Sequence, residues 1–131
     1  ATESFPFDDN RMRFVFCEDF IEHFSQQDGL AIIAECWRIL AAGGVFRLST
    51  PGFDTILRRM QPRSRVGIEF GHWGWGHRLL YTEEYLRFVL GQCGFGKIVR
   101  CAFGRSVHDE LRQIDARGEQ QDLNIIVEAT K

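Results

Sequence analysis

The sequence lacks several features that would assign a protein class at once. Its 131 residues include no apolar run close to the ~20 residues that a membrane-spanning helix needs. Positive charge is not in excess, since 16 Lys and Arg stand against 18 Asp and Glu, which argues against a dedicated nucleic-acid-binding protein. The first ten residues hold three acids and no apolar stretch, so no signal peptide is expected. Internal repeats and low-complexity tracts are also absent.

The cysteines form no C-x-x-C pair. They stand far apart in the sequence, as Cys17, Cys36, Cys93 and Cys101. Each lies in an otherwise apolar segment, which favours buried, reduced thiols over disulfides or metal ligands; disulfide pairing is the alternative. Reduced thiols are typical of cytoplasmic proteins, so we expect a cytoplasmic location.

Apolar and aromatic residues are abundant, at 44% and 13% of the chain, and this is enough to build a core. The length is that of one domain, so we expect a single domain over residues 1–131.

The first half of the chain alternates short apolar runs with an amphipathic helix. Residues 13–17 form a nearly continuous apolar run, which is typical of a buried parallel strand. Ser25 is a suitable N-cap for a helix whose apolar side chains recur at helical spacing, and the glycines at 43–44 are expected to end that helix. A second strand is predicted over residues 45–50, ended by the Pro-Gly pair at 51–52.

The second half continues the alternation. Asp54 is predicted to cap a short helix through Met60, and Thr82 to cap a longer helix that ends at Gly94. Strands are predicted at 97–103 and 123–130 with no helix between them, so this pair is expected to be antiparallel. Strands that alternate with helices indicate an α/β sheet with right-handed crossovers.

Several segments, in this order, resemble class I S-adenosylmethionine-dependent methyltransferases, in particular the methyltransferase type 11-like group. They are F-P-F-D-D-N at 5–10, E-H at 22–23, R-I-L-A-A-G-G at 38–44, T-P at 50–51 and G-H-R-x-x-Y at 76–81. The resemblance implies a Rossmann-like fold with a mostly parallel sheet, an antiparallel last strand and the order 4-5-7-6 in the family's labelling.

The same resemblance also implies that the domain is incomplete. The family fold has seven strands, and this chain accounts for the last four. The glycine-rich G-x-G-x-G turn and the acids that hold the ribose and the adenine of the cofactor have no counterpart in the sequence. We therefore expect a truncated domain that binds S-adenosylmethionine weakly or not at all by itself, because several hydrogen bonds at ~1–3 kcal/mol each are lost.

The residues after the first strand are candidates for the chemistry. By resemblance, four residues contact the cofactor: Ala1, Thr2, Cys17 and Glu18. Glu18 and His23 are the implied catalytic residues, and His23 would face the methyl-transfer site as general base. The alternative is that Glu18 and Asp19 only open a short helix or turn.

An aromatic loop provides the candidate substrate contacts. Its residues are His72, Trp73, Trp75, His77 and Tyr81. Such side chains can line an apolar pocket with a few polar anchors; the alternative is a loop that packs on itself. His72 and His77 have no evident third ligand and there is no H-E-x-x-H pattern, so no metal site is expected.

The resemblance therefore predicts transfer of a methyl group from S-adenosylmethionine to an O, N or C atom of a small molecule. A non-catalytic scaffold or subunit is the alternative. A missing N-terminal half would leave one edge of the strand at residues 14–17 unpaired, and a short apolar edge of this kind favours a homodimer. The alternative is that residues 1–10 fold back over that edge. No nucleic-acid or membrane partner is expected.

Overall fold

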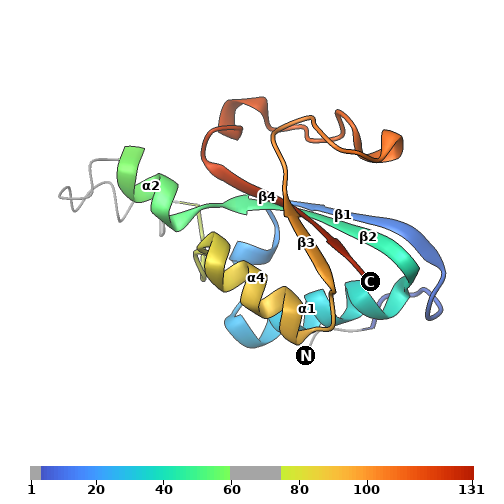
Figure 1. Cartoon of the computed structure of the whole chain (residues 1–131). Coiled ribbons are helices and arrows are strands. Elements are labelled where there is room, and N and C mark those ends of the chain that lie inside the picture. Colours follow the sequence, from blue (N-terminus) through green and yellow to red (C-terminus); the bar gives the residue numbers. More distant parts are fainter. Residues whose placement is uncertain (1–3, 60–74) are drawn as a thin grey trace.

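The computed structural model describes residues 4–59 and 75–131 (Figure 1). In chain order, the elements are β1 (Met12–Glu18), the 3-10 turn η1 (Ile21–His23), α1 (Gln26–Ile39), β2 (Leu40–Pro51), α2 (Phe53–Arg59), α4 (Glu83–Gln92), β3 (Lys97–Arg100), the 3-10 turns η2 (Asp109–Leu111) and η3 (Gly118–Gln120), and β4 (Asn124–Thr130). Within the described residues, no helix has the length and apolar character needed to cross a membrane.

The described strands form one four-stranded sheet in the order β1-β2-β4-β3. β1 and β2 are parallel, and β4 runs antiparallel to both β2 and β3. With β1 counted as the family's fourth strand, this is the order 4-5-7-6 with an antiparallel last strand. The predicted α/β class and the antiparallel pairing of the last two strands are confirmed.

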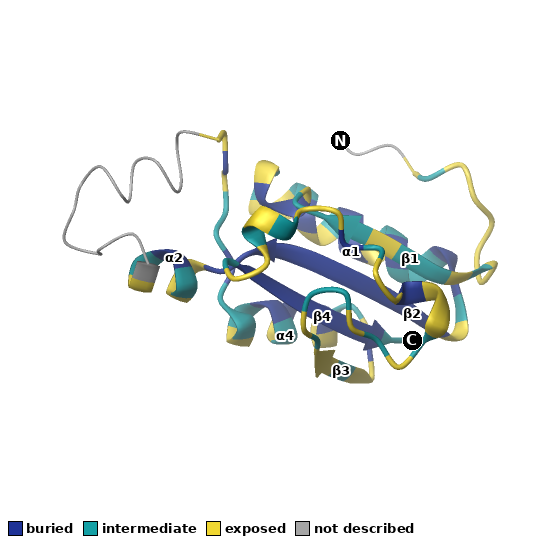
Figure 2. Cartoon of the chain, turned by 90° about the horizontal axis from the view of Figure 1, so that it is seen from above, coloured by how far each residue is buried: buried dark blue, intermediate teal, exposed yellow. Residues whose placement is uncertain are grey.

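Two layers cover the sheet. Helices α1 and α4 lie on one face, and residues 101–123 lie across the other (Figure 1). The central strands β2 and β4 are buried along most of their length (Figure 2). On the helical side, Ile33, Leu48 and Leu90 are fully buried and contribute to one hydrophobic cluster. Burial of such side chains stabilises the fold by roughly 1.5–3 kcal/mol each.

The start of α1 agrees with the sequence, but its end does not. Ser25 caps the helix by accepting a hydrogen bond from the backbone N–H of Asp28 at 3.1 Å, as predicted. The helix was expected to continue to the glycines at 43–44, and this is wrong, because α1 ends at Ile39. The backbone N–H of Gly43 donates to Lys131, and that of Lys131 donates to Gly44, so these glycines are held beside the last residue of the chain instead.

The start of α2 also differs from the prediction, whereas the start of α4 agrees with it. Asp54 lies inside the first turn of α2 and is not its cap, because β2 extends through Pro51 and the N–H of Ile56 bonds back to Gly52. The expected end of that helix at Met60 lies outside the described residues. Thr82 caps α4 as predicted, by accepting a bond from the N–H of Tyr85 at 3.1 Å.

A buried ion-pair network fixes residues 101–123 to the sheet. Arg47 of β2 is fully buried and binds Asp115 through two nitrogens and Glu128 of β4 at 2.7 Å. It also donates to the carbonyl of Arg105, and Asp115 accepts a bond from the N–H of Gly104 at 2.7 Å. Burial works against the guanidinium charge, but the bonds and charges of the two acids outweigh it and raise the pKa of Arg47. We call Arg47, Asp115 and Glu128 the Arg47 network.

Candidate functional site

The carboxyl ends of β1 and β2 meet at one edge of the sheet, where Glu18 lies opposite Ser49. The Glu18 carboxylate accepts hydrogen bonds from the backbone N–H groups of Ala116, at 3.0 and 3.1 Å, and Arg117, at 3.3 Å. Its oxygens therefore hold the loop that leads to η3. The implied contacts of Glu18 with cofactor or substrate stay a prediction.

Asp19 adds a second acid where these strands end, and its side chain is 5% exposed. Its backbone has a positive φ of 46°, and its side chain accepts a bond from the amide of Asn124 at 2.7 Å. The same amide donates to Ser49 at 2.9 Å, and Arg117 lies 3.4 Å from the other carboxylate oxygen of Asp19. Burial raises the pKa of Asp19. This group ties β1, β2 and β4 together where the strands end.

Glu22 is the most deeply buried acid of the site. It lies in η1 with 0% of its surface exposed, and Thr50 at the end of β2 donates a bond to Oε2 at 2.9 Å. Oε1 has no hydrogen-bond partner among the described residues. Burial raises the pKa of this carboxyl. Its backbone carbonyl accepts from the N–H groups of Arg78 and Leu79, at 2.7 and 3.2 Å, which fixes residues 78–79 against η1.

This backbone clamp brings two imidazoles to Glu22. The rings of His23 and His77 meet edge to face, with centroids 5.1 Å apart, and His23 Nε2 lies 3.9 Å from Glu22 Oε1. One ligand atom from each of Glu22, His23 and His77 lies within 4.8 Å of the other two. His77 is buried, whereas 40% of the His23 side chain is exposed. We call Glu22, His23, Thr50 and His77 the Glu22 cluster.

The cluster can do two kinds of chemistry. An imidazole that faces solvent beside a buried acid can accept a proton from a bound molecule. Two imidazoles and a carboxylate are also a ligand set that suits divalent transition metals.

The predicted aromatic residues separate into two environments. Trp75 is 44% exposed, and its ring lies 5.9 Å from that of His77. Tyr81 is buried in the core and stacks on Tyr85, and burial raises the pKa of Tyr81 to about 12. His77 thus belongs to the Glu22 cluster and Trp75 lies beside it, while Tyr81 packs in the hydrophobic core. His72 and Trp73 lie outside the described residues.

Sequence reasoning found part of this site. Ala1 and Thr2, the other predicted cofactor contacts, also lie outside the described residues. Glu22 and Thr50 entered the prediction only as parts of the segments E-H and T-P, and neither was predicted as a site residue. The signal for Thr50 was its position at the end of a predicted strand, since ligands of open α/β sheets bind at the carboxyl ends of strands.

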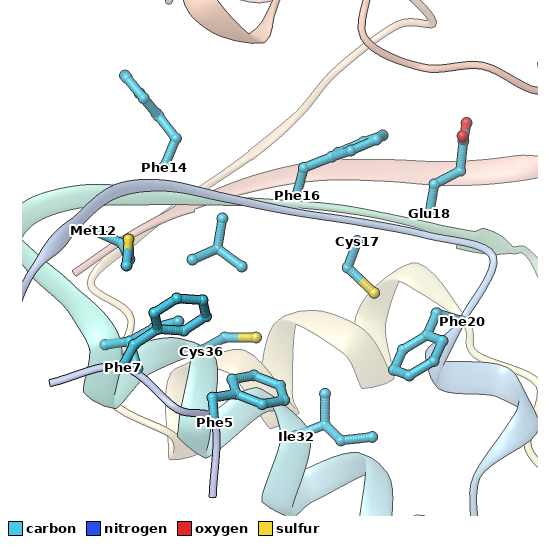
Figure 3. Close-up of a pocket in the computed structure, with 12 residues that line it drawn as sticks. Phe5, Phe7, Met12, Phe14, Phe16, Cys17, Glu18, Phe20, Ile32 and Cys36 are labelled. Atoms are coloured by element: carbon cyan, nitrogen blue, oxygen red, sulfur yellow. The ribbon is translucent and has the colours of Figure 1, made fainter. Parts of the chain in front are cut away.

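A large apolar groove of about 590 Å³ follows the outer edge of β1 (Figure 3). Phe14, Phe16 and Glu18 stand on one side of the strand, and Met12 and Cys17 on the other (Figure 3). The groove is completed by Phe5, Phe7, Val15, Phe20, Ile32, Cys36 and Ile39. Phe16 and Phe20 are 39% and 46% exposed, so the groove presents apolar surface to solvent.

The N-terminal segment lines this groove without pairing with β1. The N–H of Phe5 donates to Glu35 at 2.9 Å, and Arg38 donates to the carbonyl of Phe7 at 2.9 Å. These bonds hold the segment against α1. β1 is therefore an edge strand of the described sheet, and Phe5 and Phe7 cover part of the groove beside this edge without pairing with the strand.

The thiols are inert in this arrangement. All four cysteines are unpaired, so no disulfide forms. Burial is the main factor that raises the pKa of Cys17 and, to about 12, that of Cys36. A thiol with a raised pKa is a poor nucleophile at neutral pH. The expected burial holds for Cys36, whereas Cys17, Cys93 and Cys101 are half-buried.

Comparison with known proteins adds two findings. Residues 1–48 match a family model described as a methyltransferase domain. No curated protein matches the chain.

Solved structures resemble nearly the whole chain. A SAM-dependent methyltransferase from Archaeoglobus fulgidus is 16% identical with a TM-score of 0.63, over 95% of this chain and 62% of its own length. A SAM-dependent methyltransferase from Thermotoga maritima, described as a possible histamine N-methyltransferase, is 16% identical with a TM-score of 0.62, over 98% of this chain and 60% of its own. A putative methyltransferase of Haloferax volcanii, solved with the activator Trm112, is 13% identical with a TM-score of 0.60, over 97% and 57%. This chain thus spans about three fifths of their lengths and shares their fold.

Proposed function

Because the predicted resemblance to class I S-adenosylmethionine-dependent methyltransferases is confirmed by the family match and the fold, we propose that this chain is the carboxyl-terminal part of such an enzyme domain. The reaction is methyl transfer from S-adenosylmethionine to an O, N or C nucleophile of a small molecule. The observation that carries the proposal is the Glu22 cluster at the carboxyl ends of β1 and β2, where α/β folds of this kind bind their ligands.

The residues have separate roles in this proposal. Cys17 and Glu18 lie at the end of β1 with their side chains on opposite sides of the strand (Figure 3), and this strand end is where S-adenosylmethionine, when bound, supplies an activated methyl group. His23 is the exposed imidazole and accepts the proton of the methyl acceptor. Trp75 and His77 form the wall against which the acceptor rests. Such a site accelerates transfer mainly by holding the nucleophile in line with the methyl group.

The residues present fit the cofactor only in part. Glu18 is occupied by the N–H groups of Ala116 and Arg117, and the sequence has no G-x-G-x-G turn to approach the nucleotide. A micromolar affinity corresponds to about 8 kcal/mol, and the lost hydrogen bonds at ~1–3 kcal/mol each remove most of it. We therefore expect a dissociation constant above about 1 mM for the chain alone.

An amide NMR titration with S-adenosylhomocysteine tests this proposal at millimolar concentration. Signals from Cys17, Glu18 and His23 are expected to shift without saturating below about 1 mM. Methionine alone is the control, because it lacks the adenosyl group. Shifts confined to other surfaces would contradict the proposal. Tight, low-micromolar binding would contradict the claim that the contacts are incomplete.

A non-catalytic scaffold is the second candidate, and the missing glycine-rich turn is the observation that favours it. The coding DNA directly upstream of Ala1 separates the two. An in-frame G-x-G-x-G segment there supports the enzyme, and a ribosome-binding site there supports the scaffold. The unpaired thiols support a cytoplasmic location for either.

For the chain alone, the open edge of β1 supports a two-fold dimer in which the groove is covered by a second copy. Light scattering behind a sizing column should give twice the monomer mass of 15.2 kDa. Phe16→Glu places a charge in the groove and should yield monomer. Phe88→Glu is the control, since Phe88 on α4 is 61% exposed and lies outside the groove. A monomer at the highest concentration rules the dimer out.

A further inference from the structure

We propose that Glu22, His23 and His77 bind a divalent transition-metal cation, with Zn²⁺ as the representative ion. The three side chains come from two segments that the carbonyl of Glu22 joins through Arg78 and Leu79, and their ligand atoms lie within 4.8 Å of one another. This proposal replaces the sequence-based expectation of no metal site. That expectation considered His72 with His77, whereas the structure brings His77 to the pair at 22–23.

The buried carboxylate is the strongest reason for a cation here. Glu22 is completely buried, and its Oε1 has no hydrogen-bond partner among the described residues. A buried charged group without a partner is costly, and proteins normally pair it or give it to a metal. Oε1 is also the oxygen that lies nearest to His23, at 3.9 Å from Nε2. The unpartnered atom thus points to where the ligand atoms converge.

Thr50 behaves as a supporting residue of such a site. Its hydroxyl donates to Oε2 at 2.9 Å and is fully buried, so it fixes the carboxylate plane and leaves Oε1 toward the imidazoles. Metal-binding carboxylates are commonly held by hydrogen bonds of this kind from a second layer of residues.

The distances require only a small adjustment. Ligand atoms around a tetrahedral Zn²⁺ with bonds near 2.0–2.1 Å are roughly 3.3 Å apart. The observed separations of 3.9 Å and up to 4.8 Å are therefore slightly too long. His23 is the exposed member of the set and can turn toward Oε1, while Glu22 and His77 are held by burial.

The ligand set also indicates the class of metal and its use. Imidazole nitrogens with one carboxylate favour Zn²⁺ and related transition metals over Mg²⁺ and Ca²⁺, which prefer oxygen ligands. Three protein ligands leave a coordination position open, as in catalytic sites. Under the proposed function, that position would take a hydroxyl oxygen of the methyl acceptor and lower its pKa, so that the proton leaves to water. The inferred acceptor is then an alcohol or phenol, and the metal replaces His23 as the activating group.

Titration of the full chain with Co²⁺, followed by visible absorption, tests the site directly. We expect one equivalent to bind, with the absorption of nitrogen- and oxygen-coordinated Co²⁺, and Zn²⁺ to displace it. His23→Gln and Glu22→Gln each remove one ligand and should weaken binding by at least about 100-fold, beyond the 10–100-fold typical of supporting residues. His108→Gln is the matched control, because His108 packs beside Phe14 outside the cluster, and its affinity should stay within about twofold.

Two results would overturn the proposal. One is the absence of saturable binding at about 1 mM metal. The other is binding that persists in both His23→Gln and Glu22→Gln. His77→Gln removes a buried side chain and can unfold the protein. His23→Gln is therefore the decisive variant, because His23 is exposed, and circular dichroism verifies that each variant is folded. The outcome is separable from the proposed function, because the S-adenosylhomocysteine titration is performed in the presence of a chelator.

Discussion

Two charged side chains that the protein buries, Arg47 and Glu22, differ in how many hydrogen-bonding and ionic partners surround the charge. In the Arg47 network, the guanidinium meets two acids and two backbone carbonyls, so the charge is surrounded by partners. In the Glu22 cluster, one carboxylate oxygen is bonded to Thr50 and the other has no hydrogen-bond partner among the described residues. Arg47 and Glu22 are both fully buried, so burial alone does not distinguish the two charges. The difference lies in how completely each charge is satisfied.

This difference separates structure from function. A buried charge whose partners are all present fixes the elements that carry them, and removal of one partner is strongly destabilising. An incompletely paired charge lowers stability unless another molecule completes it, and such groups are concentrated at functional sites. We therefore interpret the Arg47 network as the structural feature that holds residues 101–123 against the sheet. We interpret the Glu22 cluster as a ligand-binding site.

The largest effect is expected from breaking the satisfied network. Arg47→Met leaves Asp115 and Glu128 buried without a counter-charge and should lower the free energy of unfolding by about 3–5 kcal/mol. Urea unfolding measures the loss. Arg11→Met is the control, because its ion pair with Asp8 is 4.0 Å long and mostly exposed, and it should cost less than about 0.5 kcal/mol. A cost for Arg47→Met as small as that of the control would mean that the network does not hold the fold.

A smaller effect is expected from removing the hydrogen bond that Thr50 donates to the Glu22 carboxylate. Thr50→Val keeps the shape of the side chain but takes away the donor to Oε2, and should cost about 1–3 kcal/mol. Thr50→Ser keeps the hydroxyl and loses one buried methyl group, at about 0.8 kcal/mol. The valine variant should therefore be the less stable of the two in urea unfolding. Equal costs would show that Thr50 acts through packing alone.

The order of the elements was predictable because local sequence patterns indicate each helix and strand. The caps at Ser25 and Thr82 and the apolar runs of β1 and β4 are visible in neighbouring residues, and the structure has them where they were expected. The end of α1 was not predictable from Gly43, because a backbone contact with Lys131 at the other end of the chain decides it.

The site was less predictable for the same reason. Arg47 finds its acids 68 and 81 residues further along, and no spacing rule connects them. His77 lies beside Glu22 because the backbone N–H groups of Arg78 and Leu79 donate hydrogen bonds to the carbonyl of Glu22. The Glu22-His23 pair was recognisable from its resemblance to a family motif. The position of His77 beside this pair depends on tertiary contacts.

The central claim is that Glu22 is held at a cost to stability, and the pH dependence of Glu22→Gln tests it most directly. Burial raises the pKa of Glu22 in the folded state above its ordinary value of 4.5. The folded protein then binds this proton more tightly than the unfolded chain, so wild-type stability falls as pH rises above 4.5, by about 1.4 kcal/mol for each unit of the rise in pKa. Glutamine has no such dependence, and Asp19, whose pKa is also raised, is common to both proteins.

Urea unfolding of both proteins in a chelating buffer, from pH 4.5 to pH 8, gives the comparison. We predict that Glu22→Gln is at least as stable as the wild type at pH 7, and that its stability relative to the wild type increases from pH 4.5 until the pH exceeds the folded-state pKa of Glu22. A variant that loses about 2 kcal/mol or more, by the same amount at every pH, would contradict the account and make Glu22 a structural residue like Arg47.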